Sequence, residues 1–111
     1  MKIKENKYLP TKGFAAINLF GVVFVRYGTK LSERTIQHES IHTKQMREML
    51  YVFFYLWYGL EWLFRWAQYR NCMTAYYNIS FEREAYANDR NVDYLAGRKW
   101  WAWERYLKKR E

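Results

Sequence analysis

Residues 38–42 read His38-Glu39-Ser40-Ile41-His42, which is the pattern HExxH and contains the only two histidines of the chain. Four residues make about one helical turn, so both imidazoles would project from one face of a helix and could share one tetrahedral metal ion. Glu39 follows the first histidine, where its carboxylate can reach a water molecule on that metal. The spacing therefore predicts a catalytic metal site, and the alternative is two surface histidines on an amphipathic helix.

The sequence around this motif is typical of a helix. No proline or glycine occurs between Ser32 and Tyr58. Ser32 is a suitable N-cap, and Glu33 places a negative charge in the first turn, where it interacts favourably with the helix dipole. The stretch 49–69 is then either a second long helix or a continuation of the first.

The first third of the chain is typical of extended structure. β-Branched and aromatic residues occupy 14–20 and 22–27 on either side of Gly21, and Gly28 follows. This pattern predicts two short strands or a hairpin. One bent strand with Gly21 at a bulge is the alternative. The expected fold class is α+β and mostly helical, with this hairpin or bent strand packed on the HExxH helix and on a glutamate-bearing helix.

The third metal ligand is expected from another helix, because two imidazoles alone hold zinc poorly. Gln45 and Glu48 stand where a metzincin would have a glycine and a third histidine. Gln45 favours no turn, so the helix should continue and carry Glu48 away from the metal. A later helix, capped by Ser80 and ending at Gly97, begins with Glu82 and Glu84. A last short helix is expected over 99–109.

The two motifs together resemble those of small gluzincin-like zinc metallopeptidases, which include the ImmA/IrrE-type domains, membrane-metallopeptidase cores and minimal stand-alone gluzincins. The resemblance covers roughly residues 14–95. The glutamate helix of these enzymes often reads E-x-E-A-D/N with the first glutamate as ligand, which favours Glu82 over Glu84. Tyr86 stands where that motif has Asp or Asn, so Asp89 or the Tyr86 hydroxyl is expected to support a zinc-binding histidine instead.

The resemblance implies a zinc-dependent peptidase of the zincin fold, with Zn²⁺ held by His38, His42 and Glu82. Glu39 would be the general base on the water that zinc activates. In zincins an edge strand before the HExxH helix binds the peptide substrate by strand addition, and residues 18–25 are in the corresponding place. A hairpin that only packs in the core is the alternative for this segment. The candidate donors to the oxyanion of the reaction are Tyr76, Tyr77, Tyr86 and Arg90.

Composition limits the other function classes. The 111 residues predict a single domain over 1–111, and 19 Lys+Arg against 11 Asp+Glu give a net charge of +8. One cysteine, Cys72, excludes an internal disulfide and a four-thiolate zinc site. The N-terminus carries charge but no apolar run, so a cytoplasmic location is expected. The basic residues are scattered and no nucleic-acid motif is present, so no specific nucleic-acid partner is expected.

An aromatic segment, residues 50–60, is the most apolar part of the chain. It is shorter than the roughly 20 residues that span a bilayer, and Glu61 and Arg65 follow it as an expected ion pair. We expect a core helix that packs against the metal helix. The alternative is a helix at a membrane surface, which the tryptophans at 100, 101 and 103 and the basic residues 108–110 would also suit. The alternative functions are a non-catalytic zinc module and a basic, aromatic adaptor at a membrane or nucleic acid.

Overall fold

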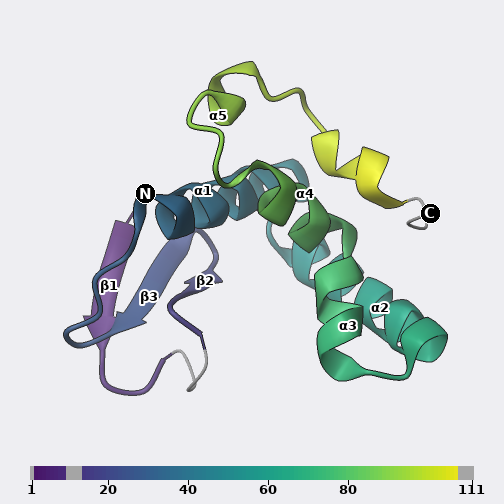
Figure 1. Cartoon of the computed structure of the whole chain (residues 1–111), viewed down its shortest axis with the longest axis horizontal. Helices are drawn as coiled ribbons and strands as arrows, with labels where there is room; N and C mark the ends of the chain where they lie inside the picture. The colour runs from purple at the N-terminus through teal and green to yellow at the C-terminus, as the bar shows by residue number, and fades with distance from the viewer. Residues whose placement is uncertain (1, 10–13, 108–111) are drawn as a thin grey trace.

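The computed structural model describes residues 2–9 and 14–107. A small β-sheet formed by the N-terminal residues is followed by a series of helices, and the described part ends in a 3₁₀ helix (Figure 1). The expected α+β, mostly helical fold class is therefore confirmed.

The sheet has three strands, β1 (Lys2–Asn6), β2 (Ile17–Leu19) and β3 (Val22–Arg26), in the order β1-β3-β2. β2 and β3 form the hairpin expected around Gly21, and they pair antiparallel. Phe20 and Gly21 have φ of 54° and 88°, and positive φ at both central residues gives a turn that matches the twist of the strands. β1 runs parallel to β3 and was not expected, because its residues are mostly exposed and show no apolar alternation.

The HExxH motif lies within α1 (Glu33–Glu48), which begins where the sequence predicts. The Ser32 hydroxyl accepts a hydrogen bond from the Thr35 amide at 3.1 Å, as an N-cap should. The helix also continues past Gln45, as expected. α2 (Val52–Tyr69) is a separate helix, because Leu50 and Tyr51 adopt φ of 52° and 61° and reverse the chain between the two.

The predicted bounds of the later helices are partly wrong. α3 (Cys72–Asn78) was not expected, and α4 (Ser80–Asn88) has Ile79 at its N-cap position in place of Ser80. The Ser80 hydroxyl instead donates a hydrogen bond to Glu61 of α2 at 2.5 Å. Gly97 does not end α4, because that helix stops at Asn88.

The C-terminal segment is less helical than expected. Gly97 closes a separate short helix, α5 (Tyr94–Gly97). A helix was expected over 99–109, and within the described part of that range the structure has a 3₁₀ helix, η1 (Ala102–Leu107). The tryptophans at 100 and 101 precede η1. The basic residues 108–110 lie outside the described part of the chain.

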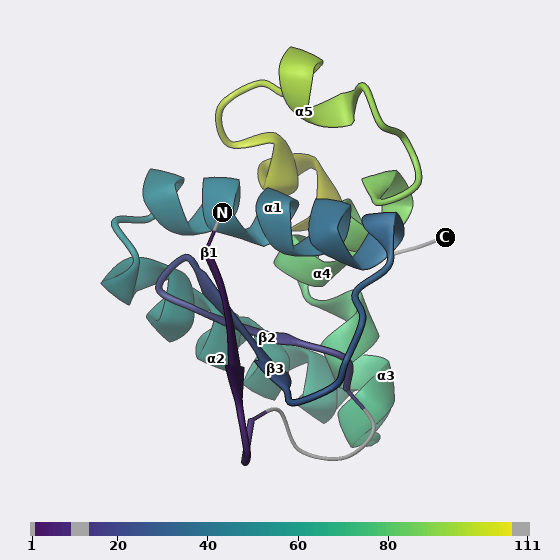
Figure 2. The same cartoon turned by 90° about the vertical axis from the view of Figure 1, so that its left-hand side faces the viewer.

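The helices pack around one apolar core. α4 lies against α1, and α2 pairs with α3 (Figures 1 and 2). The buried core residues come from α1, α2, α4, η1 and the short segments beside them, and they are Met46, Met49, Phe54, Ile79, Phe81 and Trp103. This core holds α1 and α4 in register, which determines where the motif residues of the two helices meet.

α2 packs on this core through its more polar side. Phe54, Glu61 and Arg65 are its buried residues, and Glu61 and Arg65 form the expected ion pair at 3.6 Å. The tyrosine-bearing side faces the metal helix, whereas most of its aliphatic and phenylalanine side chains are exposed. Within the described ranges, no helix has the length and apolar character needed to cross a membrane.

Candidate metal centre

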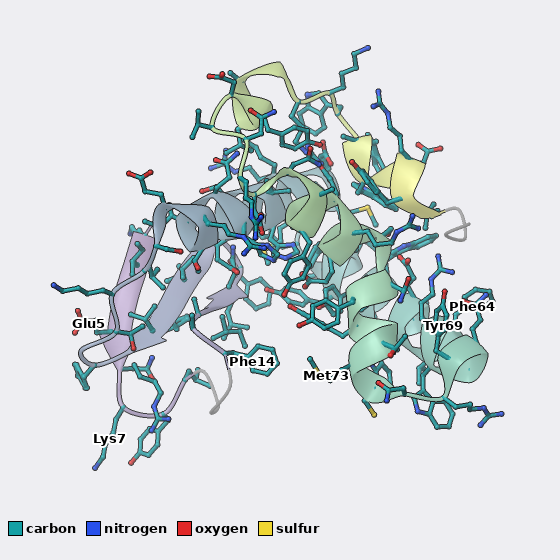
Figure 3. The ribbon with its side chains drawn as sticks, viewed as in Figure 1. Glu5, Lys7, Phe14, Phe64, Tyr69 and Met73 are labelled. Atoms are coloured by element: carbon teal, nitrogen blue, oxygen red, sulfur yellow. The ribbon has the colours of Figure 1, made fainter. Side chains whose placement is uncertain are left out.

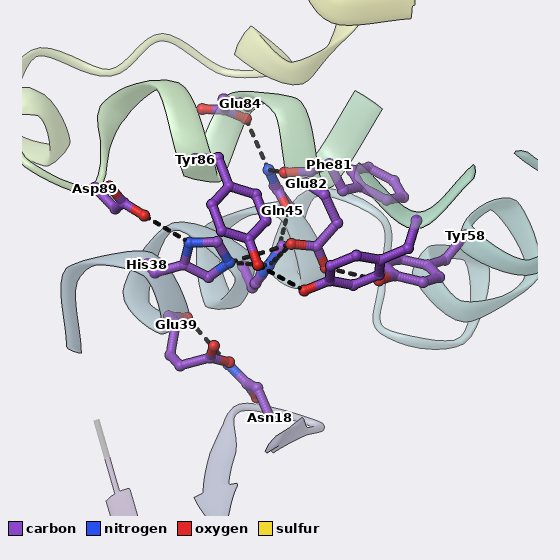
Figure 4. A network of polar contacts seen from close by, with 12 residues as sticks. Asn18, His38, Glu39, Gln45, Tyr58, Phe81, Glu82, Glu84, Tyr86 and Asp89 are labelled. Carbon is purple, nitrogen blue, oxygen red and sulfur yellow. Dashed lines mark hydrogen bonds and ion pairs between the residues drawn. The ribbon is translucent and has the colours of Figure 1, made fainter. Parts of the chain in front are cut away.

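Two histidines and a glutamate bring three ligand atoms together between α1 and α4 (Figure 4). His38 Nε2 and His42 Nε2 lie 3.1 Å apart, and they lie 3.1 and 3.0 Å from Glu82 Oε1. All three residues are buried, with exposed fractions of 7% or less. The structure therefore brings together the three residues that the sequence singled out as metal ligands.

The orientation of His38 is set by Asp89. His38 Nδ1 lies 2.9 Å from Asp89 Oδ2, and Arg34 Nε donates to the other carboxylate oxygen at 3.0 Å. An ionised carboxylate only accepts hydrogen bonds, so Nδ1 carries the hydrogen and Nε2 turns its lone pair toward Glu82. Asp89 thus fills the supporting role that was expected of it or of the Tyr86 hydroxyl. The Tyr86 ring packs against the His38 ring, with centroids 4.4 Å apart.

The orientation of His42 is set by Gln45, one turn further along α1. His42 Nδ1 lies 2.8 Å from Gln45 Oε1. The amide nitrogen of Gln45 donates to the Phe81 carbonyl at 3.0 Å and to Glu84 Oε1 at 2.9 Å, so its oxygen must be the atom that faces His42. Nδ1 therefore carries the hydrogen, and Nε2 is free to bind a cation.

Glu82 completes a cluster whose facing atoms carry no hydrogen when both histidines are neutral. Burial alone would raise the pKa of Glu82, but the positive charge and hydrogen bonds of the His42 and His38 imidazoles, when these are protonated, hold this pKa well below its usual range. Tyr58 donates a hydrogen bond to Glu82 Oε2 at 2.6 Å, which leaves Oε1 to the histidines. Two imidazole lone pairs and a carboxylate oxygen thus converge with no hydrogen donor among them, so the cluster needs a proton or a metal ion.

This donor set fits Zn²⁺, which prefers imidazole nitrogen and carboxylate oxygen in a small cluster. In the absence of a metal, a proton satisfies the cluster instead. Burial lowers the pKa of His42, but the Glu82 carboxylate outweighs it and raises that pKa to about 9.

Glu84, the alternative ligand, lies outside the cluster. Its carboxylate accepts hydrogen bonds from Gln45 at 2.9 Å, from Arg98 Nε at 2.5 Å and from the Tyr94 hydroxyl at 2.5 Å. Arg98 also pairs with Glu48 at 2.7 Å, so Glu48 points away from the histidines, as expected. Glu84 therefore acts on the site only through Gln45.

Glu39 lies beside the cluster, in the wall of a cavity. Burial raises the pKa of the Glu39 carboxyl, and His42 and His38 partly oppose this effect. Its backbone carbonyl accepts a hydrogen bond from Asn18 Nδ2 at 3.0 Å, which ties α1 to β2. The same amide nitrogen donates to Thr43 at 2.9 Å, so Asn18 fixes the hairpin against the motif helix.

The cavity has a volume of about 340 Å³ and is lined by residues of β2, α1, α2, α3 and α4 and of the segments before β2. Glu39, His42 and Glu82 give it a polar wall, and Asn18 adds an amide. The rest of its lining is mainly apolar or aromatic and includes Phe14, Ile17, Leu19, Met46, Phe54 and Tyr76. A ligand in this cavity would touch the cluster on one side and apolar side chains on the other.

The four candidate oxyanion donors differ in whether they line the cavity. Tyr76 lines the cavity, and its hydroxyl lies 3.0 Å from that of Tyr86. Tyr77 packs its ring on Tyr76 and Tyr86, with centroids 5.1 and 5.2 Å away. Arg90 is exposed and is not among the residues that line the cavity. Tyr76 is thus the candidate that faces the cavity most directly.

Gln45 and Tyr58 were not anticipated as parts of the site, and Asn18 was anticipated only as part of the strand expected to bind the substrate. Gln45 lies seven residues after His38 and three residues after His42. Helical spacing therefore placed it on the same face and could have revealed its contact with His42. No local signal distinguishes Tyr58 or Asn18, because tertiary packing brings them to the site.

No family model, curated protein or solved structure matches this chain. The resemblance to gluzincin-like peptidases therefore stays a prediction from the two sequence motifs.

Proposed function

We propose that this protein is a zinc-dependent metallopeptidase of the gluzincin-like type. His38, His42 and Glu82 would hold the metal. The observation that carries the proposal is the position of Glu39, which lines the same cavity as His42 and Glu82 without belonging to the three-atom cluster. A glutamate so placed is available for acid–base work on a bound substrate.

The chemistry divides between the metal and the chain. Bound Zn²⁺ would supply a Lewis acid that polarises a carbonyl and acidifies water to a pKa of around 7. Glu39 would take a proton from the attacking water and then deliver it to the departing amine. Its pKa, raised by burial, favours this exchange near neutral pH. Tyr76 would donate a hydrogen bond to the oxygen that becomes negative during attack.

The substrate class follows from the cavity. Its apolar lining suits a peptide with a large apolar side chain beside the bond that is cleaved. β2 borders the cavity and pairs only with β3 in the described sheet, so its outer edge can accept an extended peptide by strand addition. We propose a peptide or protein segment of this kind as the substrate.

The alternative function that also uses zinc is a non-catalytic module, in which the same three ligands would join α1 to α4. Structural zinc sites are almost always closed by four protein ligands. Only three candidate ligands meet among the described residues, which favours a site with a position left for water or substrate. The cytoplasmic location and the peripheral association with a membrane expected from the sequence stay predictions, and the second is taken up below.

A peptide-library assay tests the proposal. Protein loaded with one equivalent of zinc is incubated with a mixture of peptides, and the products are identified by mass spectrometry. We expect cleavage next to large apolar residues, loss of cleavage with a chelator and recovery on adding zinc. Glu39→Gln should bind zinc as the wild type does but cleave at least about a thousandfold more slowly. A zinc-loaded wild type with no cleavage above that of Glu39→Gln would leave the non-catalytic module as the better account.

A further inference from the structure

α2 is oriented with its charged residues inside and its apolar residues outside. Its only two charged side chains, Glu61 and Arg65, are buried, with exposed fractions of 7% and 4%. Glu61 accepts hydrogen bonds from the Ser80 amide and the Ser80 hydroxyl at 2.6 and 2.5 Å. Arg65 donates to the Leu107 carbonyl at 2.7 Å. A helix that faces water normally shows the opposite arrangement.

The outward side of α2 therefore carries no charged side chain. We call it the outer face and define it by Val52, Phe53, Leu56, Leu60, Leu63 and Phe64, which are between 55% and 65% exposed. These residues recur at helical spacing from Val52 to Phe64, so they form one continuous stripe about 18 Å long. In Figure 3, Phe64 and Tyr69 lie at the right-hand end of the molecule.

The rest of the exposed surface is strongly basic. Among the described residues classed as exposed, twelve are Lys or Arg, and only Glu5, Glu33, Asp93 and Glu104 are acidic. The imbalance arises because Glu39, Glu61, Glu82, Glu84 and Asp89 are buried. At the end of α2, Arg70 stacks on Trp66, with its guanidinium 4.9 Å from the ring centroid. A basic surface that bears an apolar, aromatic stripe is typical of proteins that bind anionic bilayers.

We propose that the outer face of α2 docks the protein on the surface of an anionic lipid bilayer. The helix lies in the plane of the interface, with the stripe in the acyl-chain boundary and the basic residues near the headgroups. The net charge favours a bilayer over a second copy of the chain as the partner of the outer face, because two copies with a net charge of +8 repel one another. Anionic lipid instead attracts a protein with this net positive charge.

Docking in this way brings the cavity close to the membrane. Phe54, Tyr55 and Tyr58 of α2 line the cavity, so the helix that binds lipid also forms part of the substrate wall. An apolar segment of a membrane-associated protein would then be within reach. The docking itself does not depend on the metal or on peptidase activity, so it can be tested separately.

Vesicle co-sedimentation tests the proposal. The full chain is mixed with phosphatidylcholine vesicles that contain or lack phosphatidylglycerol. The outer-face variants are Leu60→Glu/Phe64→Glu and Leu60→Ser/Phe64→Ser, of which the second preserves the net charge. Tyr27→Glu/Val92→Glu is the matched control, because these residues are 70% and 80% exposed, lie outside α2 and receive the same two charges. Thermal melts by circular dichroism check that each variant is folded.

We expect the wild type to bind the vesicles that contain phosphatidylglycerol and to bind pure phosphatidylcholine weakly. Both outer-face variants should bind at least about tenfold more weakly than the wild type, and the control within about threefold of it. Equal binding by the folded outer-face variants and the control would overturn the proposal. Binding of the wild type to neither kind of vesicle would also overturn it. So would a wild type that is a dimer while the outer-face variants are monomers.

Discussion

Gln45 accepts a hydrogen bond from His42 Nδ1 at 2.8 Å, and both residues lie on the buried face of α1. This contact determines which nitrogen of His42 faces Glu82. It also links the cluster to α4, because the same side chain donates to the Phe81 carbonyl and to Glu84. A side chain outside the three-atom cluster thus sets the orientation of His42, one of the proposed ligands.

Replacing Gln45 by Leu should weaken zinc binding without removing a ligand. The change leaves His42 Nδ1 without its acceptor, and loss of such a partner typically lowers metal affinity by about 10–100-fold. Competition with a fluorescent chelator measures the affinity. Gln37→Leu is the matched control, since Gln37 is on the same helix but donates to the Asn91 carbonyl away from the cluster. Equal losses in both variants would contradict the role given to Gln45.

Zinc binding should release a proton. The Glu82 carboxylate raises the pKa of His42 to about 9 in the metal-free protein, against a desolvation effect that lowers it, so His42 is protonated at neutral pH. The metal must displace that proton, so zinc affinity should rise about tenfold per pH unit until the pH approaches 9. Calorimetry in buffers of different ionisation enthalpy counts the protons, and we expect about one per zinc near neutral pH. A heat of binding independent of the buffer would contradict this assignment.

The stability of the metal-free protein should depend on pH through the same group. The pKa of His42 is higher in the folded chain, at about 9, than its ordinary value of 6.5. The stabilisation from its charged form is therefore fully present below pH 6.5 and is lost as the pH rises toward 9. We expect the melting temperature of the metal-free protein to fall across this window and that of the zinc-loaded protein to fall less. An equal fall in melting temperature with pH for the metal-free and zinc-loaded forms would argue against a His42–Glu82 contact.

Changing Glu82 and Glu84 to glutamine should have different effects. Glu82→Gln removes the anionic ligand and should abolish stoichiometric zinc binding. Glu84→Gln should retain zinc but lower the free energy of unfolding by about 3 kcal/mol, because the buried Arg98 loses one of its two carboxylate partners. Zinc content by mass spectrometry and urea unfolding distinguish the two. Retention of zinc by Glu82→Gln would contradict the ligand assignment.

Tyr76→Phe should slow catalysis and leave metal binding intact. If its hydroxyl donates to the developing oxyanion, kcat should fall on the order of a hundredfold while the zinc content stays the same. Tyr77→Phe is the matched control, because Tyr77 is the next residue on α3 and does not line the cavity. The comparison needs a peptide substrate from the library assay. Similar kcat values for the two variants would remove Tyr76 from the mechanism.

The parts of the site that depend on local spacing could be predicted from the sequence. The interval between His38 and His42 places both on one helix face, whatever the rest of the chain does. The hairpin around Gly21 and the Ser32 cap are local in the same sense. Glu82 was preferred as the third ligand because its motif resembles that of gluzincin-like peptidases. The structure brings Glu82 to the histidines from a second helix.

The remaining features depend on contacts between distant segments. Glu84 has the same chemistry as Glu82, and it is the pairing with Arg98 that takes it out of the cluster. The break between α1 and α2 occurs at Leu50 and Tyr51, without the glycine or proline that would have marked it. The composition of α2 indicated an amphipathic helix, but not that Glu61 would be turned inward to bind Ser80.

The most direct test of the metal centre is native mass spectrometry of protein purified without added metal. The wild type and Glu39→Gln should each carry one zinc ion per chain, because Glu39 is not a ligand. His42→Ala should carry none while keeping its helical circular dichroism. A folded wild type that contains no zinc and takes up none when it is added would contradict the account.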